Sequence, residues 1–96
     1  MPSEVSARRI ARIREALRAA LDPLELQIAD ESHLHRGHAG AASGAGHFRV
    51  RIVSASFAGR SRVQRHRSVY EALRAELGPE IHALALETLA PGERGA

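Results

Sequence analysis

The chain has 96 residues, which is enough for one domain built around one hydrophobic core. It contains no cysteine, so the chain alone forms no disulfide, no thiolate metal site and no thiol nucleophile. Aromatic residues make up only 3% of it, which argues against a base-stacking surface, and its net charge of +3 reflects arginine without any lysine.

We expect a single domain over residues 1–96, with its core at about 4–90 and a loose tail at 91–96. No apolar run approaches the roughly 20 residues that a membrane-spanning helix requires. The Arg-rich stretch Ala7–Leu21 contains Glu15, which is uncharacteristic of a transit peptide. We therefore interpret it as part of the domain and expect a cytoplasmic protein without membrane contact.

A helix that ends at Leu21 is the first predicted element. Ser3 or Ser6 can cap its first turn, and Asp22-Pro23 stops it because proline cannot continue the helical hydrogen-bond ladder. Apolar residues recur at spacings of three and four and define one buried face: Ile10, Ile13, Leu17, Ala20 and Leu21.

Two predicted strands flank a long irregular segment. Leu24–Ile28 alternates apolar and polar residues, as a half-buried strand does. Residues 30–46 are rich in glycine and show no period, and connections of this length are usually functional or disordered. The second strand runs from Phe48 to about Phe57, with Arg49 and Arg51 on the face opposite its apolar residues.

The second half of the chain predicts a helix followed by a strand. Ser61 can cap a helix over about Arg62–Leu77, and Gly78-Pro79 ends it. The apolar stripe of this helix is Val63, His66, Tyr70, Leu73 and Leu77. Ile81–Leu89 has apolar residues at both odd and even positions, so both faces of this third strand can be covered. The predicted order is helix, strand, strand, helix, strand.

Histidine is the unusual component, with six residues in this short chain. His33, His35 and His38 lie in the irregular segment with the spacing H-x-H-x-x-H, and His47 stands where that segment enters the second strand. Imidazole is a common ligand of zinc, copper and iron, so this spacing permits a metal site. A solvated polar loop is the simpler explanation, because a metal site needs a fixed geometry.

The two remaining histidines have different settings. His66 shares the predicted stripe with apolar residues, and we interpret it as a hydrogen-bonded core histidine rather than a ligand. His82 begins an apolar strand, where an unpartnered imidazole would be costly to bury. It is therefore at the surface, hydrogen-bonded or ligated.

The sequence contains no recognisable nucleophile–base pair and no glycine-rich phosphate loop before a helix. We therefore expect a protein that is not an enzyme. The residues by themselves indicate a small basic binding domain that carries a His-bearing loop.

Several segments resemble the BolA family, and together they cover about residues 4–90. They are His47–Val50, Ile52–Ser54, Phe57–Gly59, Val63–Tyr70 and Ile81–Leu86, with Asp30–Ser32 and Arg36–His38 upstream. The resemblance implies an α/β (α+β) fold, in which helices pack on one face of a mixed three-stranded sheet, similar to a class II K-homology domain.

The resemblance also implies a partner. BolA proteins pair with monothiol glutaredoxins that carry a Cys-Gly-Phe-Ser site, and the pair can share a bridging 2Fe–2S cluster with glutathione. The matching ligands in this chain are His82 and one histidine from the loop between the first two strands. We favour His38 for that loop ligand, with His47 as the alternate, and expect no cluster in the isolated chain.

DNA binding is the alternative function. Some bacterial BolA proteins are transcriptional regulators, and the resemblance then assigns DNA contacts to the basic second helix, at Arg65 and Arg67, with Arg60 and Arg62 nearby. We expect Arg65 to project to solvent. True K-homology domains clamp nucleic acid with a Gly-x-x-Gly loop, whereas here Arg62 stands three places after Gly59.

Two further hypotheses remain open. The spacing of His33, His35 and His38 permits a zinc-binding loop that would hold metal without any partner. The sequence also leaves a homodimer possible.

Overall fold

The computed structural model describes residues 4–35 and 44–94. The elements follow one another as helix α1 (Glu4–Leu21), strand β1 (Glu25–Asp30), 3-10 helix η1 (Ser32–His35), strand β2 (Gly46–Val53), 3-10 helix η2 (Ala55–Phe57), helix α3 (Arg62–Ala72) and strand β3 (Ile81–Leu89). The predicted order of helices and strands is confirmed, and the two 3-10 helices are additions to it.

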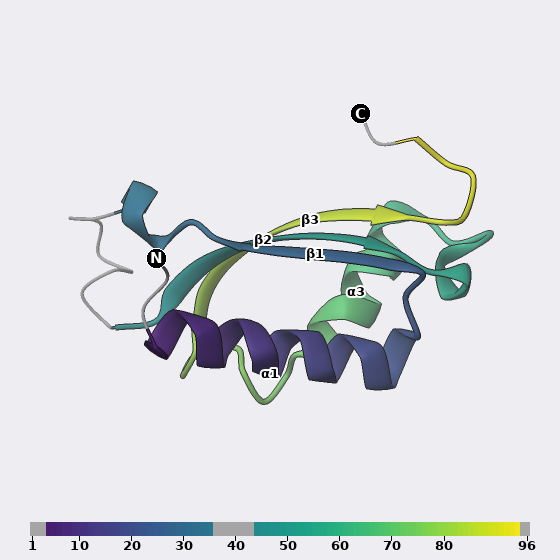
Figure 1. Cartoon of the computed structure of the whole chain (residues 1–96). Coiled ribbons are helices and arrows are strands. Elements are labelled where there is room, and N and C mark those ends of the chain that lie inside the picture. Colours follow the sequence, from purple (N-terminus) through teal and green to yellow (C-terminus); the bar gives the residue numbers. More distant parts are fainter. Residues whose placement is uncertain (1–3, 36–43, 95–96) are drawn as a thin grey trace.

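Within these residues the strands form one three-stranded sheet in the order β1-β2-β3. Strands β1 and β2 are antiparallel, whereas β2 and β3 are parallel. Helices α1 and α3 cover the same face of the sheet (Figure 1). The predicted α+β fold, a mixed three-stranded sheet with helices on one face, is therefore confirmed.

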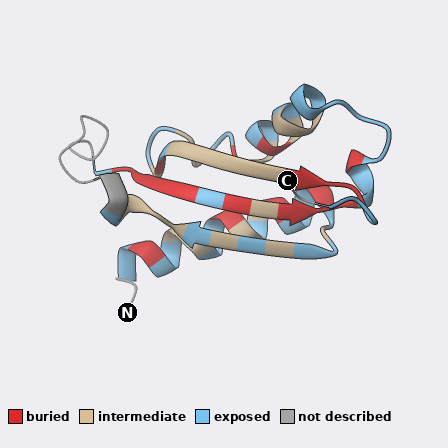
Figure 2. Cartoon of the chain, turned by 90° about the horizontal axis from the view of Figure 1, so that it is seen from above, coloured by how far each residue is buried: buried red, intermediate tan, exposed pale blue. Residues whose placement is uncertain are grey.

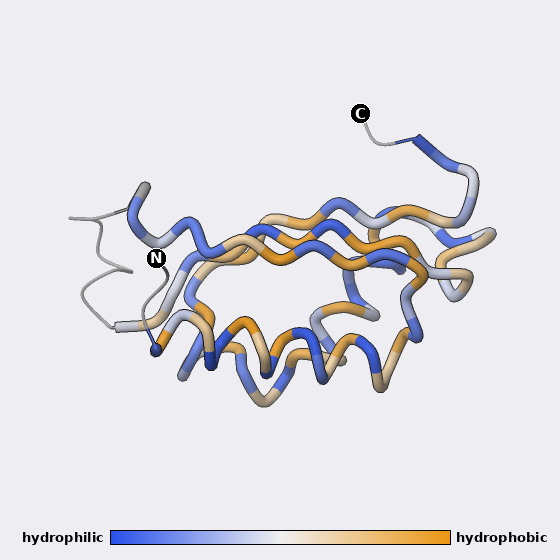
Figure 3. Tube along the Cα trace, viewed as in Figure 1, coloured by the Kyte–Doolittle hydropathy of each residue, from blue (hydrophilic) through white to orange (hydrophobic). Residues whose placement is uncertain are grey.

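Apolar side chains from every layer meet between the sheet and the helices. The buried members of this core are Ile13, Leu17, Leu21, Phe48, Val50, Ile52, Phe57, Val69, Leu73, Ile81 and Ala90. The central strand β2 is the most buried of the sheet (Figure 2), and hydrophobic and hydrophilic residues alternate along β1 and β2 (Figure 3). No helix in the described part of the chain is long and apolar enough to cross a membrane.

Helix α1 buries its predicted face, and Ser6, one of its two predicted caps, lies within the helix. Leu17 is fully buried, whereas Ala20 is exposed because the buried stripe runs along i, i+4 positions and leaves residue 20 at its edge. The Ser6 hydroxyl donates to the carboxylate of Asp30. Ser3 lies outside the described residues.

Strand β1 is shifted toward the C-terminus relative to the predicted Leu24–Ile28. Leu24 is 67% exposed and precedes the strand, which begins at Glu25. The strand continues to Asp30 because its antiparallel pairing with β2 continues to that residue.

Strand β2 includes His47 and ends earlier than the predicted Phe57. Ser54 stops it, since its hydroxyl accepts a hydrogen bond from the N–H of Ser56 and so caps η2. The short helix η2 then turns Phe57 into the core, where it is 0% exposed.

Helix α3 presents a different face to the core than its predicted stripe. Val63 and Tyr70 are 59% and 42% exposed, whereas Val69 and Leu73 are fully buried. The predicted stripe is therefore wrong at Val63 and Tyr70 and right at Leu73. The helix itself begins as predicted, with the Ser61 side chain and the Gln64 side chain capping each other's backbone N–H.

The chain leaves α3 through tight turns instead of continuing as a helix to Leu77. The N–H groups of Glu76 and Leu77 both donate to the carbonyl of Leu73, and Gly78 has φ 97. These turns allow Leu77 to pack against the core and bring the chain to β3, whose bounds match the prediction. The middle of β3 is half-buried, so its two faces are only partly covered.

Candidate functional site

Two of the predicted ligand residues, His47 and His82, lie next to each other. Strands β2 and β3 are parallel, so both begin at the same end of the sheet. Gly46 pairs with Ile81 but His47 pairs with Ala83, so His82 is the extra residue of a β-bulge. The centroids of the two imidazole rings are 5.2 Å apart, with 51° between the ring planes.

This ring separation fits two ligands of one metal ion. A metal–nitrogen bond of about 2.1 Å and tetrahedral geometry place two imidazole centroids roughly 5 Å apart. His47 is only 8% exposed whereas His82 is exposed, so one imidazole is held in place and the other faces solvent. No three His, Asp or Glu side chains in residues 4–35 and 44–94 cluster to hold a metal, so these residues would need ligands from elsewhere.

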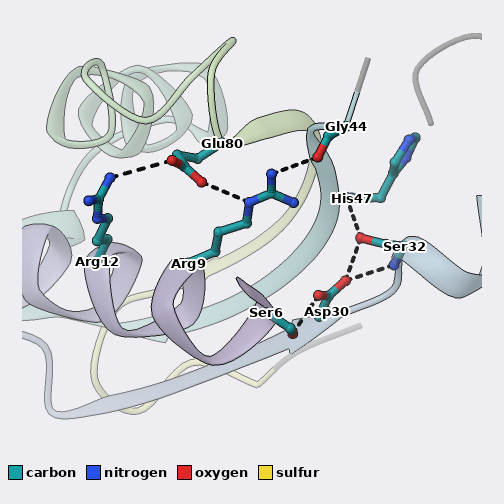
Figure 4. Close-up of polar contacts among 8 residues, drawn as sticks. All are labelled: Ser6, Arg9, Arg12, Asp30, Ser32, Gly44, His47 and Glu80. Atoms are coloured by element: carbon teal, nitrogen blue, oxygen red, sulfur yellow. Dashed lines mark hydrogen bonds and ion pairs between the residues drawn. The ribbon is translucent and has the colours of Figure 1, made fainter. Parts of the chain in front are cut away.

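Asp30 and Ser32 hold the backbone of His47. Ser32 Oγ accepts from the N–H of His47 at 3.1 Å and donates to Asp30 Oδ1, which also accepts from the N–H of Ser32 at 2.8 Å (Figure 4). The carbonyl of His47 accepts from the N–H of Glu31 at 2.8 Å. These bonds join the start of β2 to the residues that follow β1.

The Asp30 carboxylate is stabilised in its charged form. Burial by itself would raise the pKa of Asp30, but hydrogen bonds from Ser32 and Ser6 and the positive charge of Arg9 outweigh it and lower the pKa below its ordinary value. The carboxylate therefore remains an acceptor for both serines at neutral pH.

Gly46 is required where β2 passes Ser32. A Cβ at this position would lie 2.6 Å from a ring carbon of Phe48 and 3.0 Å from Ser32 Oγ. A larger residue would therefore clash with the Phe48 ring and crowd the hydroxyl that binds the His47 N–H.

A second group of contacts, which the sequence analysis missed, connects α1 with both strands that carry the histidines. Arg9 Nε donates to Glu80 Oε2 at 2.7 Å and Arg9 Nη2 donates to the carbonyl of Gly44 at 2.6 Å. The contacting residues are 71 and 35 positions apart, so no local pattern could indicate them.

The other histidines of the loop are only partly described. His33 is exposed in η1, and His38 lies outside the described residues. The predicted zinc-binding loop and the predicted ligation by His38 therefore stay predictions.

His66 is half-buried and lines a surface groove, which differs from the predicted core position. Burial, with the charge of Arg62 in addition, lowers its pKa below the ordinary value. The prediction was wrong because it relied on Val63 and Tyr70, which the fold leaves exposed.

Arg65 does not project to solvent as predicted, and its side chain is only 11% exposed. Its guanidinium donates to both carboxylate oxygens of Glu93 at 2.6 and 2.9 Å and to the carbonyl of Thr88 at 3.1 Å. The guanidinium carbon also lies 6.0 Å from the ring centroid of Phe57. These contacts anchor Glu93, so the chain is not loose directly after Pro91.

Other arginines surround a groove of about 550 Å³ along β3 and the start of α3. Arg49, Arg60, Arg62 and Arg94 line it together with His66. Arg49 pairs with Glu31, but Arg60, Arg62 and Arg94 form no ion pair within residues 4–35 and 44–94. Glu87 and Glu93 also line the groove, but the arginines outnumber them, so its net charge is positive.

Comparisons with known proteins agree on one family. The family model described as BolA-like protein matches residues 17–93. An uncharacterised protein from the cobS 5' region of a Sinorhizobium species is 49% identical, over 84% of this chain and 89% of that protein. The DNA-binding transcriptional regulator BolA of Escherichia coli is 47% identical, over 80% of this chain and 70% of the regulator.

One solved structure is similar to this chain in both fold and sequence. The BolA domain of SufE1 from Arabidopsis thaliana has a TM-score of 0.77 and 44% sequence identity, covering 88% of this chain and 93% of that domain. On the matched family model, the sequence identities and this structural agreement, the chain belongs to the BolA-like family.

Proposed function

We propose that the chain is a non-catalytic, cytoplasmic partner of a monothiol glutaredoxin with a Cys-Gly-Phe-Ser site, and that the two proteins share a bridging 2Fe–2S cluster with glutathione. The observation that supports this most is the contact between His47 and His82, which comes from two strands that begin side by side. His82 is one ligand, His47 is the second, and His38 is the alternative to His47.

The donor atoms suit an iron–sulfur cluster that is shared and exchangeable. Imidazole ligands in place of thiolates raise the reduction potential of a 2Fe–2S cluster, and only the neutral imidazole binds metal. His82 is exposed, so it can reach metal held by a second protein without rearrangement of the core. The chain has no cysteine, so the thiolate ligands come from the partner and glutathione.

Anaerobic co-expression with a Cys-Gly-Phe-Ser glutaredoxin tests this proposal. Visible absorption and circular dichroism of the purified pair report the shared cluster, and far-ultraviolet circular dichroism of each variant reports its fold. We expect His82→Ala to lose the signal of the mixed complex, whereas the matched control His66→Ala keeps it. An unchanged spectrum in His82→Ala would exclude His82 as a ligand.

The same spectra distinguish the two candidate loop ligands. If His47 is the second ligand, His47→Ala loses the signal and His38→Ala retains it. The reverse result would assign ligation to His38.

DNA binding is the second candidate function. The relative from Escherichia coli is named a DNA-binding transcriptional regulator. Arg60, Arg62 and Arg94 in the charged groove are available for phosphate oxygens, because no described carboxylate pairs with them. Arg67 is also exposed on α3. Arginine contacts to phosphates release counterions, so such binding depends steeply on salt.

A titration of duplex DNA at several salt concentrations tests this candidate. We expect Arg62→Ala to weaken binding and to reduce the salt slope by about one unit per lost phosphate contact. Arg74→Ala is the matched control, because Arg74 lies beyond α3 and pairs with Glu71 at 3.0 Å. Binding that is absent, or insensitive to salt, would exclude this function.

A further inference from the structure

Arg9 lies at the junction of three segments that are far apart in the sequence. Its guanidinium donates to the carboxylate of Glu80, which precedes β3, and to the carbonyl of Gly44, which precedes β2 (Figure 4). The side chains of Arg9 and Glu80 are only 15% and 21% exposed. Charge-assisted hydrogen bonds of this kind are stronger than those between neutral groups.

Glu80 extends this connection directly to β2. Its carbonyl accepts from the N–H of Gly46 at 3.0 Å, while its carboxylate is held by Arg9 at 2.7 Å and by Arg12 at 3.4 Å. The carboxylate and the carbonyl of Glu80 thus join α1 to the start of β2.

Gly46 and Glu80, which this junction joins, lie just before the two histidines. Gly46 is followed by His47, and Glu80 is separated from His82 by Ile81 alone. At this point the pairing of β2 and β3 contains the bulge that brings His82 beside His47. A shift of either strand start would change the separation of the rings.

The same end of α1 also contacts the end of β1. Ser6 lies about one helical turn before Arg9, and its hydroxyl donates to the carboxylate of Asp30. That carboxylate accepts from Ser32, whose hydroxyl accepts from the N–H of His47. The first turns of α1 thus contact the Asp30 side chain at the end of β1 and the Gly44 carbonyl just before β2.

We propose that Arg9 is a positioning residue that sets the relative placement of His47 and His82 through Glu80 and Gly44. The effect of this placement on cluster binding rests on the proposed function, but the placement of the two rings is a property of the chain alone. A planar guanidinium can donate to Glu80 and Gly44 at once in two fixed directions, which the single ammonium group of lysine does not reproduce.

Nuclear magnetic resonance of the isolated chain tests the proposal without any metal. The readouts are the nuclear Overhauser contacts between the two imidazole rings and the hydrogen-exchange rates of the Gly46 and His47 amides. In Arg9→Lys we expect the ring contacts to weaken and these amides to exchange about tenfold faster, through the loss of a charge-assisted hydrogen bond.

Matched variants separate positioning from general stability. Arg12→Ala removes only the longer and more exposed of the two arginine contacts to Glu80, so we expect unchanged ring contacts. Glu80→Gln keeps a hydrogen-bond acceptor but removes the charge, so we expect an intermediate exchange rate. The amide of Ile52, in the buried part of β2, reports global unfolding. A loss of global stability alone would accelerate it together with the Gly46 and His47 amides and would leave the ring contacts unchanged.

The two possible failures give different results. If Arg9→Lys keeps the ring contacts and the exchange rates of the parent chain, Arg9 does not position the histidines and the proposal is wrong. If the contacts weaken but the parent chain forms no shared cluster with glutaredoxin, the positioning role stands and the proposed function fails.

Discussion

His47 and His82 contact each other but differ in burial, and this difference separates their structural roles. His47 is 8% exposed and its backbone is bound by Ser32 and Glu31, whereas the side chain of His82 faces solvent. We therefore expect a substitution at position 47 to affect the fold as well as the proposed ligation, and one at position 82 to affect the proposed ligation alone.

Urea unfolding of the metal-free chain tests this difference. We expect His47→Ala to lower the free energy of unfolding by about 1–3 kcal/mol through lost packing, and His82→Ala to change it by less than about 0.5 kcal/mol. Equal losses in the two variants would mean that His82 also supports the fold.

We expect Glu93 to make the free energy of unfolding depend on pH in the acid range. The bidentate hydrogen bonds from Arg65 and a further one from the N–H of Ala90 lower the pKa of Glu93 from 4.5 to about 2. A carboxyl group with a lowered pKa in the folded state stabilises that state above pH 4.5, and this contribution is lost as pH falls through about 2.

The variant Glu93→Gln isolates that contribution from those of other carboxyl groups. We expect the parent chain to be more stable than Glu93→Gln at pH 7, and the difference to shrink steadily between pH 4.5 and 2. Urea unfolding at several pH values measures it, and a difference that does not depend on pH would contradict the assigned pairing.

At the scale of the elements, α3 joins the C-terminal segment to the core through Arg65. This side chain contacts Glu93, Thr88 and the ring of Phe57, so its positive charge is paired within the fold.

We expect Arg65→Ala to lower the melting temperature, because these contacts are lost. In a DNA titration well below that temperature, we expect Arg65→Ala to keep the salt slope of the parent chain, whereas Arg62→Ala reduces it. A reduced slope in Arg65→Ala would show that Arg65 contacts phosphate.

Sequence reasoning predicted well an element whose apolar period agrees with its final packing, and another whose apolar run has clear ends. The spacing of Ile13 and Leu17 located the buried face of α1, and the bounds of β3 were predicted correctly. Helix α3 was harder, because Val63 and Tyr70 follow the helical period as well as Val69 does, and only the packing against α1 and β3 selects between these faces.

At the scale of the whole molecule, the candidate site depends on contacts that cross the fold. Resemblance to the family pointed to His82 and to a loop histidine, but not to the residues that hold them. The contacts of Arg9 with Glu80 and Gly44, and of Ser6 with Asp30, join the first helix to later strands. A sequence pattern carries no signal for such pairs, because each residue has an ordinary role in its own element.

The topology of the sheet explains why the histidine pair forms at this place. Because β2 and β3 are parallel neighbours, they start at the same end of the sheet, and the bulge at the start of β3 brings His82 toward His47. The histidine pair is therefore built on strands, and contacts from α1 hold the segments beside it.

Pulsed electron paramagnetic resonance of the one-electron-reduced complex is the most direct test of the central claim. The chain is labelled with nitrogen-15 in its histidines only, and the glutaredoxin is left unlabelled. We predict two strong nitrogen-15 couplings in the parent complex and the loss of one of them in His82→Ala whenever a cluster is retained. A parent complex that carries the cluster but shows no nitrogen-15 coupling would contradict the claim that imidazoles of this chain bind the iron.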